Sequence, residues 1–260
     1  MRKFLLALLG LGGIALAAFL IFGPAWFDKQ TNMVDGKPLP EIRAEAQELH
    51  DSLMIVDLHG DTLLWKRKIT DSVDYGHIDL ERLEAGNVGL QIFSSVTKTP
   101  KGQNYDSNSG DTDNITLLAI TQLQPVRTWF SLLERQLYHA QKLDKAVAAS
   151  GGRLASISQP AHLDRLDKSI GVLFSAEGLQ TLEGDRANLK KLYASGMRMA
   201  GLVHFFDNEL AGSMHGIEKG GLTDFGRTIV RDMEQMGMIV DIAHSSHATV
   251  ADILKMAKRP

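Results

Sequence analysis

Short apolar segments alternate with amphipathic segments through most of this sequence, from about residue 41 onward. In the clearest instance Thr223 is a suitable N-cap, and a stripe at helical spacing follows it: Phe225, Ile229, Met233 and Met236. Gly237 then provides a helix C-terminus, and the apolar segment 238–243 leads to His244. Helices that alternate with short apolar strands indicate a parallel sheet covered by helices.

Five such strands are expected in all, over residues 53–57, 88–93, 170–175, 197–203 and 238–243. A doubly wound nucleotide-binding fold normally has a glycine-rich turn after its first strand, whereas this chain has Leu58-His59-Gly60-Asp61 there. Functional residues of a barrel collect at the carboxyl ends of several strands, and four of the five expected strands end in this way. The sequence therefore predicts an α/β fold, a (β/α)8 TIM-type barrel with about the first five βα units.

The N-terminus predicts a membrane segment. Arg2 and Lys3 precede an apolar run without charged residues from Phe4 to Phe27, which is long enough to span a bilayer core of ~30 Å. Basic residues before the run favour an uncleaved signal anchor with a cytoplasmic N-terminus. The alternative is a secreted protein whose signal peptide is cleaved after Ala15-Leu16-Ala17. The predicted division is 1–27 transmembrane helix, 28–40 polar linker and 41–260 barrel domain, extracytoplasmic in both cases.

Composition excludes several classes of site. The 28 basic and 31 acidic residues are well mixed and give a net charge of −3, so nucleic acid is not an expected partner. The chain has no cysteine, which excludes disulfides, thiolate metal sites and a cysteine nucleophile. Any metal must therefore be held by His, Asp and Glu. Whether the protein forms a homodimer stays open.

Side chains that could bind a metal lie at the ends of the expected strands. His59 and Asp61 are two residues apart, so in extended backbone their side chains point to the same side. Glu177, His204 and His244 each follow a different apolar strand. Each has a plain structural explanation by itself: a turn-capping Asp, a helix N-terminal Glu, or a histidine in the core. Their combination at separate strand ends instead predicts a site for zinc or a similar divalent ion.

Four other residues are less informative. Asp57 and Asp241 lie within strands, and we expect them to orient ligand imidazoles. His139 lies on a predicted helix and is expected at the surface. His215, in a glycine-flanked loop, is a weaker candidate for the border of the site.

Several segments together resemble the membrane dipeptidase (renal dipeptidase) family of zinc peptidases, which have amidohydrolase-like barrels. The matching segments run in the family's order from residue 51 to about 255: Val56-Asp57-Leu58-His59-Gly60-Asp61, Leu83-Glu84-Ala85-Gly86-Asn87-Val88-Gly89-Leu90-Gln91, Ser175-Ala176-Glu177-Gly178, Gly196-Met197-Arg198, Leu202-Val203-His204, Gly221-Leu222-Thr223-Asp224-Phe225-Gly226 and Val240-Asp241-Ile242-Ala243-His244. Each segment is weak alone, and the ordered series is specific.

The resemblance implies a site with two Zn2+ ions. His59 and Asp61 would bind one ion, Glu177 would bridge both, and His244 would bind the second. His204 would contact the substrate and act in catalysis by stabilising charge on the tetrahedral intermediate. The implied reaction is hydrolysis of the peptide bond of dipeptides by a metal-activated hydroxide.

The sequence also departs from the family pattern. In the family a second histidine for the second metal follows on the next strand, and a substrate-binding arginine and an acid/base aspartate come later. This sequence ends at Pro260, after the fifth expected strand. We therefore expect a truncated chain or a partial sequence that is inactive alone.

Two other functions stay open for the same barrel. One is a metal-dependent amidohydrolase for a cyclic amide, a lactone or a phosphoester. The other is a non-catalytic exported binding protein.

Overall fold

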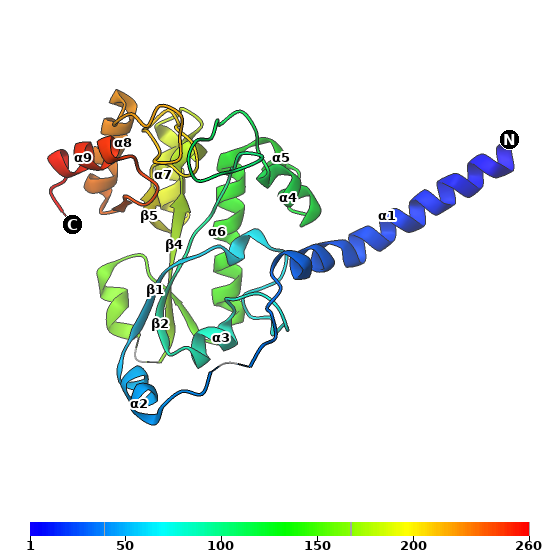
Figure 1. Ribbon diagram of the computed structural model, residues 1–260, viewed down its shortest axis with the longest axis horizontal. Coiled ribbons are helices and arrows are strands. Elements are labelled where there is room, and N and C mark those ends of the chain that lie inside the picture. Colours follow the sequence, from blue (N-terminus) through cyan, green and yellow to red (C-terminus); the bar gives the residue numbers. More distant parts are fainter. Residues whose placement is uncertain (39, 167, 260) are drawn as a thin grey trace.

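A curved parallel sheet organises the body of the protein in the computed structural model, which describes residues 1–38, 40–166 and 168–259 (Figure 1). The strands are β1 (Ile55–Gly60), β2 (Val88–Phe93), β3 (Leu154–Ser156), β4 (Ile170–Glu177), β5 (Met197–Gly201) and β6 (Ile239–Asp241). They lie in the order β1-β2-β4-β5-β6, and β3 pairs with the first half of β4. Among the described strands, β1 and β6 each pair on one side, so the sheet is an open, curled half-barrel.

The five strands expected from the sequence are present, and the parallel arrangement is confirmed. Their bounds differ: β1 begins two residues later than expected and runs on to Gly60, so that His59 lies inside it. The sequence did not predict β3, because three residues are too few to show an alternating pattern.

Helices connect consecutive strands and cover the outer face of the sheet (Figure 1). The helices of the body include α3 (Leu80–Ala85), α6 (Leu132–Ala149), α7 (Ala187–Ala194), α8 (Asp224–Met236) and α9 (His247–Met256). The remaining ones are α1 (Arg2–Thr31), α2 (Ala44–Ser52), α4 (Ile115–Thr121) and α5 (Arg127–Phe130). Single 3-10 turns occur at η1 (Thr62–Leu64), η2 (Pro160–Arg165) and η3 (Leu179–Leu182).

Local signals fix the ends of these helices. The Thr223 hydroxyl accepts a hydrogen bond from the Gly226 amide at the start of α8, and Gly237 ends the helix with a φ of 71°. Ser131 caps α6 by accepting from the Glu134 amide, in a Ser-x-x-Glu pattern. Because α8 ends at Gly237, β6 begins two residues later, at Ile239.

The two faces of the sheet bury different sets of residues. The outer face packs against the helices through the main core, which includes Phe93, Phe174, Leu189, Leu192, Met197, Ile229 and Met233. The concave face carries a smaller cluster that includes Ile92 and Leu173. Side chains alternate along a strand, so Glu177 lies on the same face as Leu173, at the carboxyl end of β4.

The helix α1 projects from the body, as Figure 1 shows, and most of its side chains are exposed. It is long and apolar enough to cross a membrane, by length and composition. It does not end at residue 27, however, because it continues to Thr31, and Asp28 is only 1% exposed. Residues 28–31, expected in the linker, are therefore helical.

His139 is not at the surface, contrary to the sequence-based expectation. It is fully buried on α6, where its Nδ1 lies 2.6 Å from the Ser95 hydroxyl and its Nε2 lies 3.3 Å from the Gln124 amide nitrogen. Burial, reinforced by the nearby charges of Lys142 and Arg135, holds the pKa of His139 well below its ordinary value. The buried imidazole is therefore neutral at physiological pH.

Candidate metal centre

The carboxyl ends of four strands bring the predicted site residues together. Glu177 is the last residue of β4, and His59 is the last but one of β1. His204 and His244 each lie three residues beyond a strand, after β5 and β6. Asp61 follows β1 directly and occupies the N-cap position of η1, without a capping hydrogen bond from its side chain.

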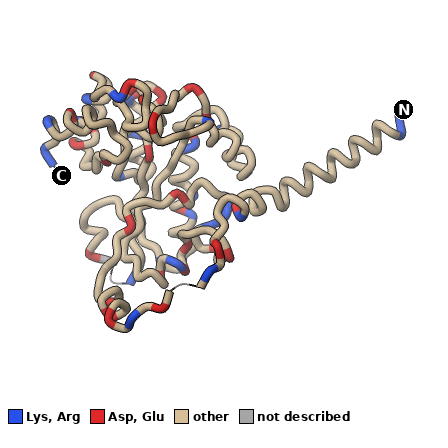
Figure 2. Tube along the Cα trace, in the orientation of Figure 1, with Lys and Arg blue, Asp and Glu red and all other residues tan. Residues whose placement is uncertain are grey.

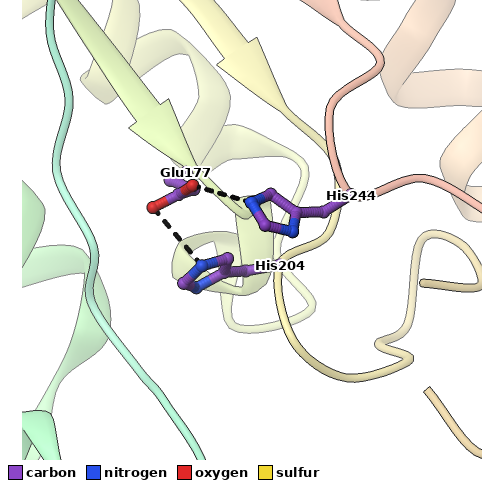
Figure 3. A group of neighbouring side chains, drawn as sticks. All are labelled: Glu177, His204 and His244. Atoms are coloured by element: carbon purple, nitrogen blue, oxygen red, sulfur yellow. Dashed lines mark hydrogen bonds and ion pairs between the residues drawn. The ribbon is translucent and has the colours of Figure 1, made fainter. Parts of the chain in front are cut away.

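One group consists of the Glu177 carboxylate and two histidines that point towards it (Figure 3). His244 Nε2 lies 3.0 Å from Glu177 Oε1, and His204 Nε2 lies 3.4 Å from Glu177 Oε2. The candidate ligand atoms of these residues all lie within 4.8 Å of one another. Both rings point towards the carboxylate from loops that follow neighbouring strands.

A second group shares the same carboxylate. His59 Nε2 lies 3.7 Å from Glu177 Oε2 and 3.4 Å from Asp61 Oδ2. The three candidate ligand atoms again lie within 4.8 Å of one another. Glu177 therefore belongs to both groups, with His59 and Asp61 in one and the two loop histidines in the other.

Neighbouring charged side chains set the protonation states of Glu177 and His59. Burial disfavours ionisation of Glu177, but the hydrogen bond from His244 and the positive fields of His204 and His59 outweigh it. The pKa of that carboxyl accordingly lies below its ordinary value. The hydrogen bond to Asp61 raises the pKa of His59 to about 9, against the effect of burial, and the charges of Glu177 and Asp241 add to it. Without a metal, His59 is thus the cation that balances these carboxylates.

His204 is the most buried member of the cluster, with 5% of its surface exposed. Burial lowers the pKa of His204 to about 4, although the charge of Glu177 opposes the shift. Its imidazole is therefore neutral at pH 7, and each ring nitrogen is available as a donor or as a ligand atom, depending on the tautomer.

Two aspartates shape the backbone at the strand ends. The Asp57 carboxylate accepts a hydrogen bond from the His59 amide at 3.1 Å, and the Asp241 carboxylate accepts one from the Ala243 amide at 2.9 Å. Both side chains bond to the backbone two residues on, rather than to an imidazole as expected. His244 itself has a φ of 60°, the left-handed region that non-glycine residues seldom adopt. The turn at Asp241 thus leads into a constrained backbone that aims the His244 ring at Glu177.

An aromatic wall beside His244 was only weakly indicated by the sequence. The His215 ring stacks on Phe205 with centroids 4.5 Å apart and lies 5.1 Å from the His244 ring. His215 Nδ1 is 2.7 Å from the Tyr105 carbonyl oxygen, and the His215 carbonyl accepts from the Asn108 amide at 2.8 Å. Residues 105–108 are thereby held against the loop that carries His215, which borders the site.

The residues present fit a divalent metal. Three buried polar atoms in the cluster have no hydrogen-bond partner among the described residues: Asp61 Oδ1, His204 Nδ1 and His244 Nδ1. Two carboxylates and three imidazoles are the donor set that zinc accepts in the absence of cysteine. A cation would also relieve the repulsion between carboxylates, which otherwise requires a proton on His59.

Comparison with known proteins gives a family match over most of the chain. Residues 43–260 match the family model of membrane dipeptidase (peptidase family M19). The dipeptidase aclJ of Aspergillus oryzae is 29% identical over 223 residues, 79% of this chain and 48% of that protein. An uncharacterised dipeptidase of Schizosaccharomyces pombe is 30% identical over 234 residues, 85% of this chain and 53% of the relative. The chain spans about half the length of these relatives.

Solved structures show a similar fold. A metallopeptidase from Rhodobacter sphaeroides, liganded with a phosphinate mimic of the dipeptide L-Ala-D-Ala, has a TM-score of 0.62 and 17% identity. The match covers 80% of this chain and 63% of that one. The probable dipeptidase PvdM from Pseudomonas aeruginosa has a TM-score of 0.65 and 19% identity. This match covers 83% of the present chain and 53% of PvdM. The curled parallel sheet thus corresponds to part of a TIM-like barrel.

Proposed function

The chain belongs to the membrane dipeptidase family, peptidase family M19, and from this premise we propose that its strand-end cluster is the metal centre of a dipeptidase. One observation carries the proposal: the Glu177 carboxylate is shared by two groups of candidate ligands. A bridging carboxylate between two such groups suits a pair of divalent ions. The substrate class is dipeptides, and the reaction is hydrolysis of their single peptide bond.

The residues divide into metal holders and a substrate contact. His59 and Asp61 would hold one Zn2+, His244 would hold the second, and Glu177 would serve both. When bound, the cations supply Lewis-acid charge and lower the pKa of the attacking water. Glu177 is ionised because its pKa is low, so it offers one oxygen to each side.

His204 acts on the substrate in this proposal. Its neutral ring is buried and fixed beside Glu177, so a ring N–H can donate to the oxygen on which negative charge develops. The same geometry places His204 Nε2 near the candidate ligand atoms of the second group. Metal content and ligand binding therefore have to be measured separately for this residue.

The first experiment measures metal. The chain is dialysed against Zn2+, and its metal content is determined by mass spectrometry together with that of Glu177→Gln. Loss of bound zinc in this variant is expected, because both groups share the carboxylate. Glu209→Gln, which changes an exposed glutamate outside the cluster, is the matched control and should bind as the parent does. Equal zinc in the parent and Glu177→Gln would overturn the metal centre.

The second experiment tests the substrate class. Because the family's second-metal histidine, substrate arginine and acid/base aspartate are not assigned in this chain, binding is measured before turnover. A phosphinate mimic of a dipeptide should bind the zinc-loaded protein and not the chelated one. His204→Gln should retain zinc and lose at least ten-fold in affinity for the mimic. Hydrolysis of cyclic amides, lactones or phosphoesters without binding of the mimic would replace the proposal, and binding of neither metal nor mimic would favour a non-catalytic protein.

We also propose that α1 is a signal anchor that leaves the body outside the cytoplasm. Arg2 and Lys3 before the apolar run and the exposure of its side chains support this topology. The mass of the protein, recovered from both the membrane fraction and the soluble exported fraction, tests it. A chain that starts at Met1 is expected, whereas a mass beginning at Ala18 would show cleavage and a secreted protein.

A further inference from the structure

The base of α1 is packed into the body of the protein instead of leading into a free tether. Phe27 lies 6.3 Å from Trp65 between ring centroids, and the Gln122 side chain donates to the Pro24 carbonyl at 3.2 Å. The Gly76 amide donates to the Asn32 carbonyl at 2.7 Å. These contacts attach the last two turns of α1 to three separate segments of the chain.

Ionic contacts strengthen the same junction. Asp28 and Arg67 form an ion pair in which both side chains are buried, with 1% and 6% exposed. Lys29 pairs with Asp74 at 2.7 Å near the surface. A helix that is held at several points cannot swing freely, so the direction in which α1 leaves the body is fixed.

The α4–α5 patch lies beside this junction and consists of Leu117, Val126 and Phe130. The helix α4 contacts both α1 and α5, and Figure 1 shows α4 and α5 on the side of the body from which α1 emerges. The three side chains are 62%, 59% and 84% exposed, which is unusual for large apolar groups on two helices that contact each other.

The segment that contains α4 and leads to α5 has no charged side chains. The sequence has no Asp, Glu, Lys or Arg from Asn114 to Val126, and Figure 2 shows this stretch in tan beside α1. The first charged residue after it, Arg127, pairs with Glu134 at 2.9 Å on the body. An uncharged apolar surface with an aromatic residue and a basic one at its edge suits the boundary between lipid headgroups and acyl chains.

We propose that the α4–α5 patch rests on the lipid surface in which α1 is inserted, so that the body contacts the membrane at two places. The inference depends on the proposal that α1 is a membrane anchor. Continuity with α1 selects lipid as the occupant, because the docked base of α1 brings α4 to the level at which the apolar helix leaves the body. The strand-end site is consequently held in one orientation relative to the membrane.

The experiment uses the absence of cysteine, because a single introduced cysteine is labelled alone. Leu117→Cys and Phe130→Cys are labelled with an environment-sensitive dye, and the full chain is reconstituted in phosphatidylcholine–phosphatidylglycerol vesicles. Leu11→Cys in the middle of α1 reports insertion of the anchor. Leu254→Cys, an exposed leucine on α9 at the far side of the body, is the matched control.

A lipid-borne quencher should reduce the emission of dye at positions 11, 117 and 130 and leave position 254 unchanged. A second variant, Phe130→Asp, should lower the quenching at position 117 at least two-fold, whereas Leu254→Asp should not. Quenching at position 11 with none at 117 and 130 would overturn the inference. So would a dye at 130 that is shielded from aqueous iodide but not quenched by lipid, since protein would then cover the patch.

The same experiment shows separately whether α1 is inserted in the membrane and whether the metal centre forms. No quenching at position 11 would show that α1 is not inserted, and the inference would fail together with the anchor. The zinc content of the same samples reports on the metal centre independently of either result.

Discussion

At the scale of single residues, the grouping of the candidate ligand side chains could be predicted because strand ends are recognisable in sequence. Glu177, His204 and His244 each follow an apolar segment, and the parallel sheet brings such positions to one edge. The contact between His215 and Tyr105 was not predictable, since it joins loops 110 residues apart that carry no periodic pattern. The roles that Asp57 and Asp241 have at the backbone also depend on turn geometry that spacing does not reveal.

The proposed division of ligands predicts different losses for single substitutions. His59→Gln should remove the ion on the Asp61 side, and His244→Gln should remove the ion on the other side, each leaving about half of the bound zinc. The reason is that each histidine belongs to one group, whereas Glu177 belongs to both. Zinc content by mass spectrometry checks this. Complete loss in both variants would mean that the cluster holds a single ion.

Burial of His139 predicts a dependence of stability on pH. Its pKa is held far below the ~6.5 of an unfolded histidine, so below pH ~6.5 the unfolded chain binds a proton that the folded protein does not. The contribution of His139 to the free energy of unfolding should fall by about 1.4 kcal/mol for each pH unit below that value, until the folded-state pKa is reached. Urea unfolding of the protein and His139→Gln between pH 7.5 and 5 measures the two slopes.

The difference in slope between the parent protein and His139→Gln isolates the contribution of His139. Burial also lowers the pKa of His204, and that contribution is common to both proteins and cancels in the difference. The slope should be smaller in His139→Gln by up to one proton equivalent. Identical slopes would show that His139 takes up a proton without unfolding.

At the scale of elements, helix ends were easier to predict than short strands. Thr223 and Gly237 bound α8 as expected, because capping depends on residues adjacent in sequence. The three-residue β3 is recognisable only through its pairing with β4, which is a tertiary contact. The four extra residues of α1 likewise include Asp28 and Lys29, which form ion pairs with residues of the body.

Removal of the cap on α8 should measurably destabilise the body. Thr223→Ala loses the hydrogen bond from the Gly226 amide and the one donated to the Glu209 carbonyl, which should cost about 1 kcal/mol, up to ~2 kcal/mol. Thr223→Ser retains a hydroxyl at the same place and is the control. Urea unfolding measures both, and equal losses in the two variants would contradict a capping role.

At the scale of the whole molecule, the sheet and the junction with α1 determine how the protein is assembled. The outer strands β1 and β6 leave Val56, Leu58 and Ile239 exposed, while the docked base of α1 joins the apolar helix to the body. The sequence predicted the apolar helix from composition alone. Its docking was hidden because the partners of Asp28 and Pro24 lie 39 and 98 residues away along the chain.

The buried pair at that junction provides a test of the coupling between α1 and the body. Asp28→Asn leaves the Arg67 charge buried without its partner, which should cost about 3 to 5 kcal/mol. Asp28→Leu combined with Arg67→Met removes both charges and should recover most of that loss, because apolar side chains of similar size can fill the same space. Thermal unfolding in detergent measures stability, and limited proteolysis after residue 31 measures release of the helix. If Asp28→Asn unfolds at the same temperature as the parent and resists the protease equally, the ion pair does not hold α1 to the body. The direction of α1 must then come from the other contacts at the junction, those of Pro24, Phe27, Lys29 and Asn32.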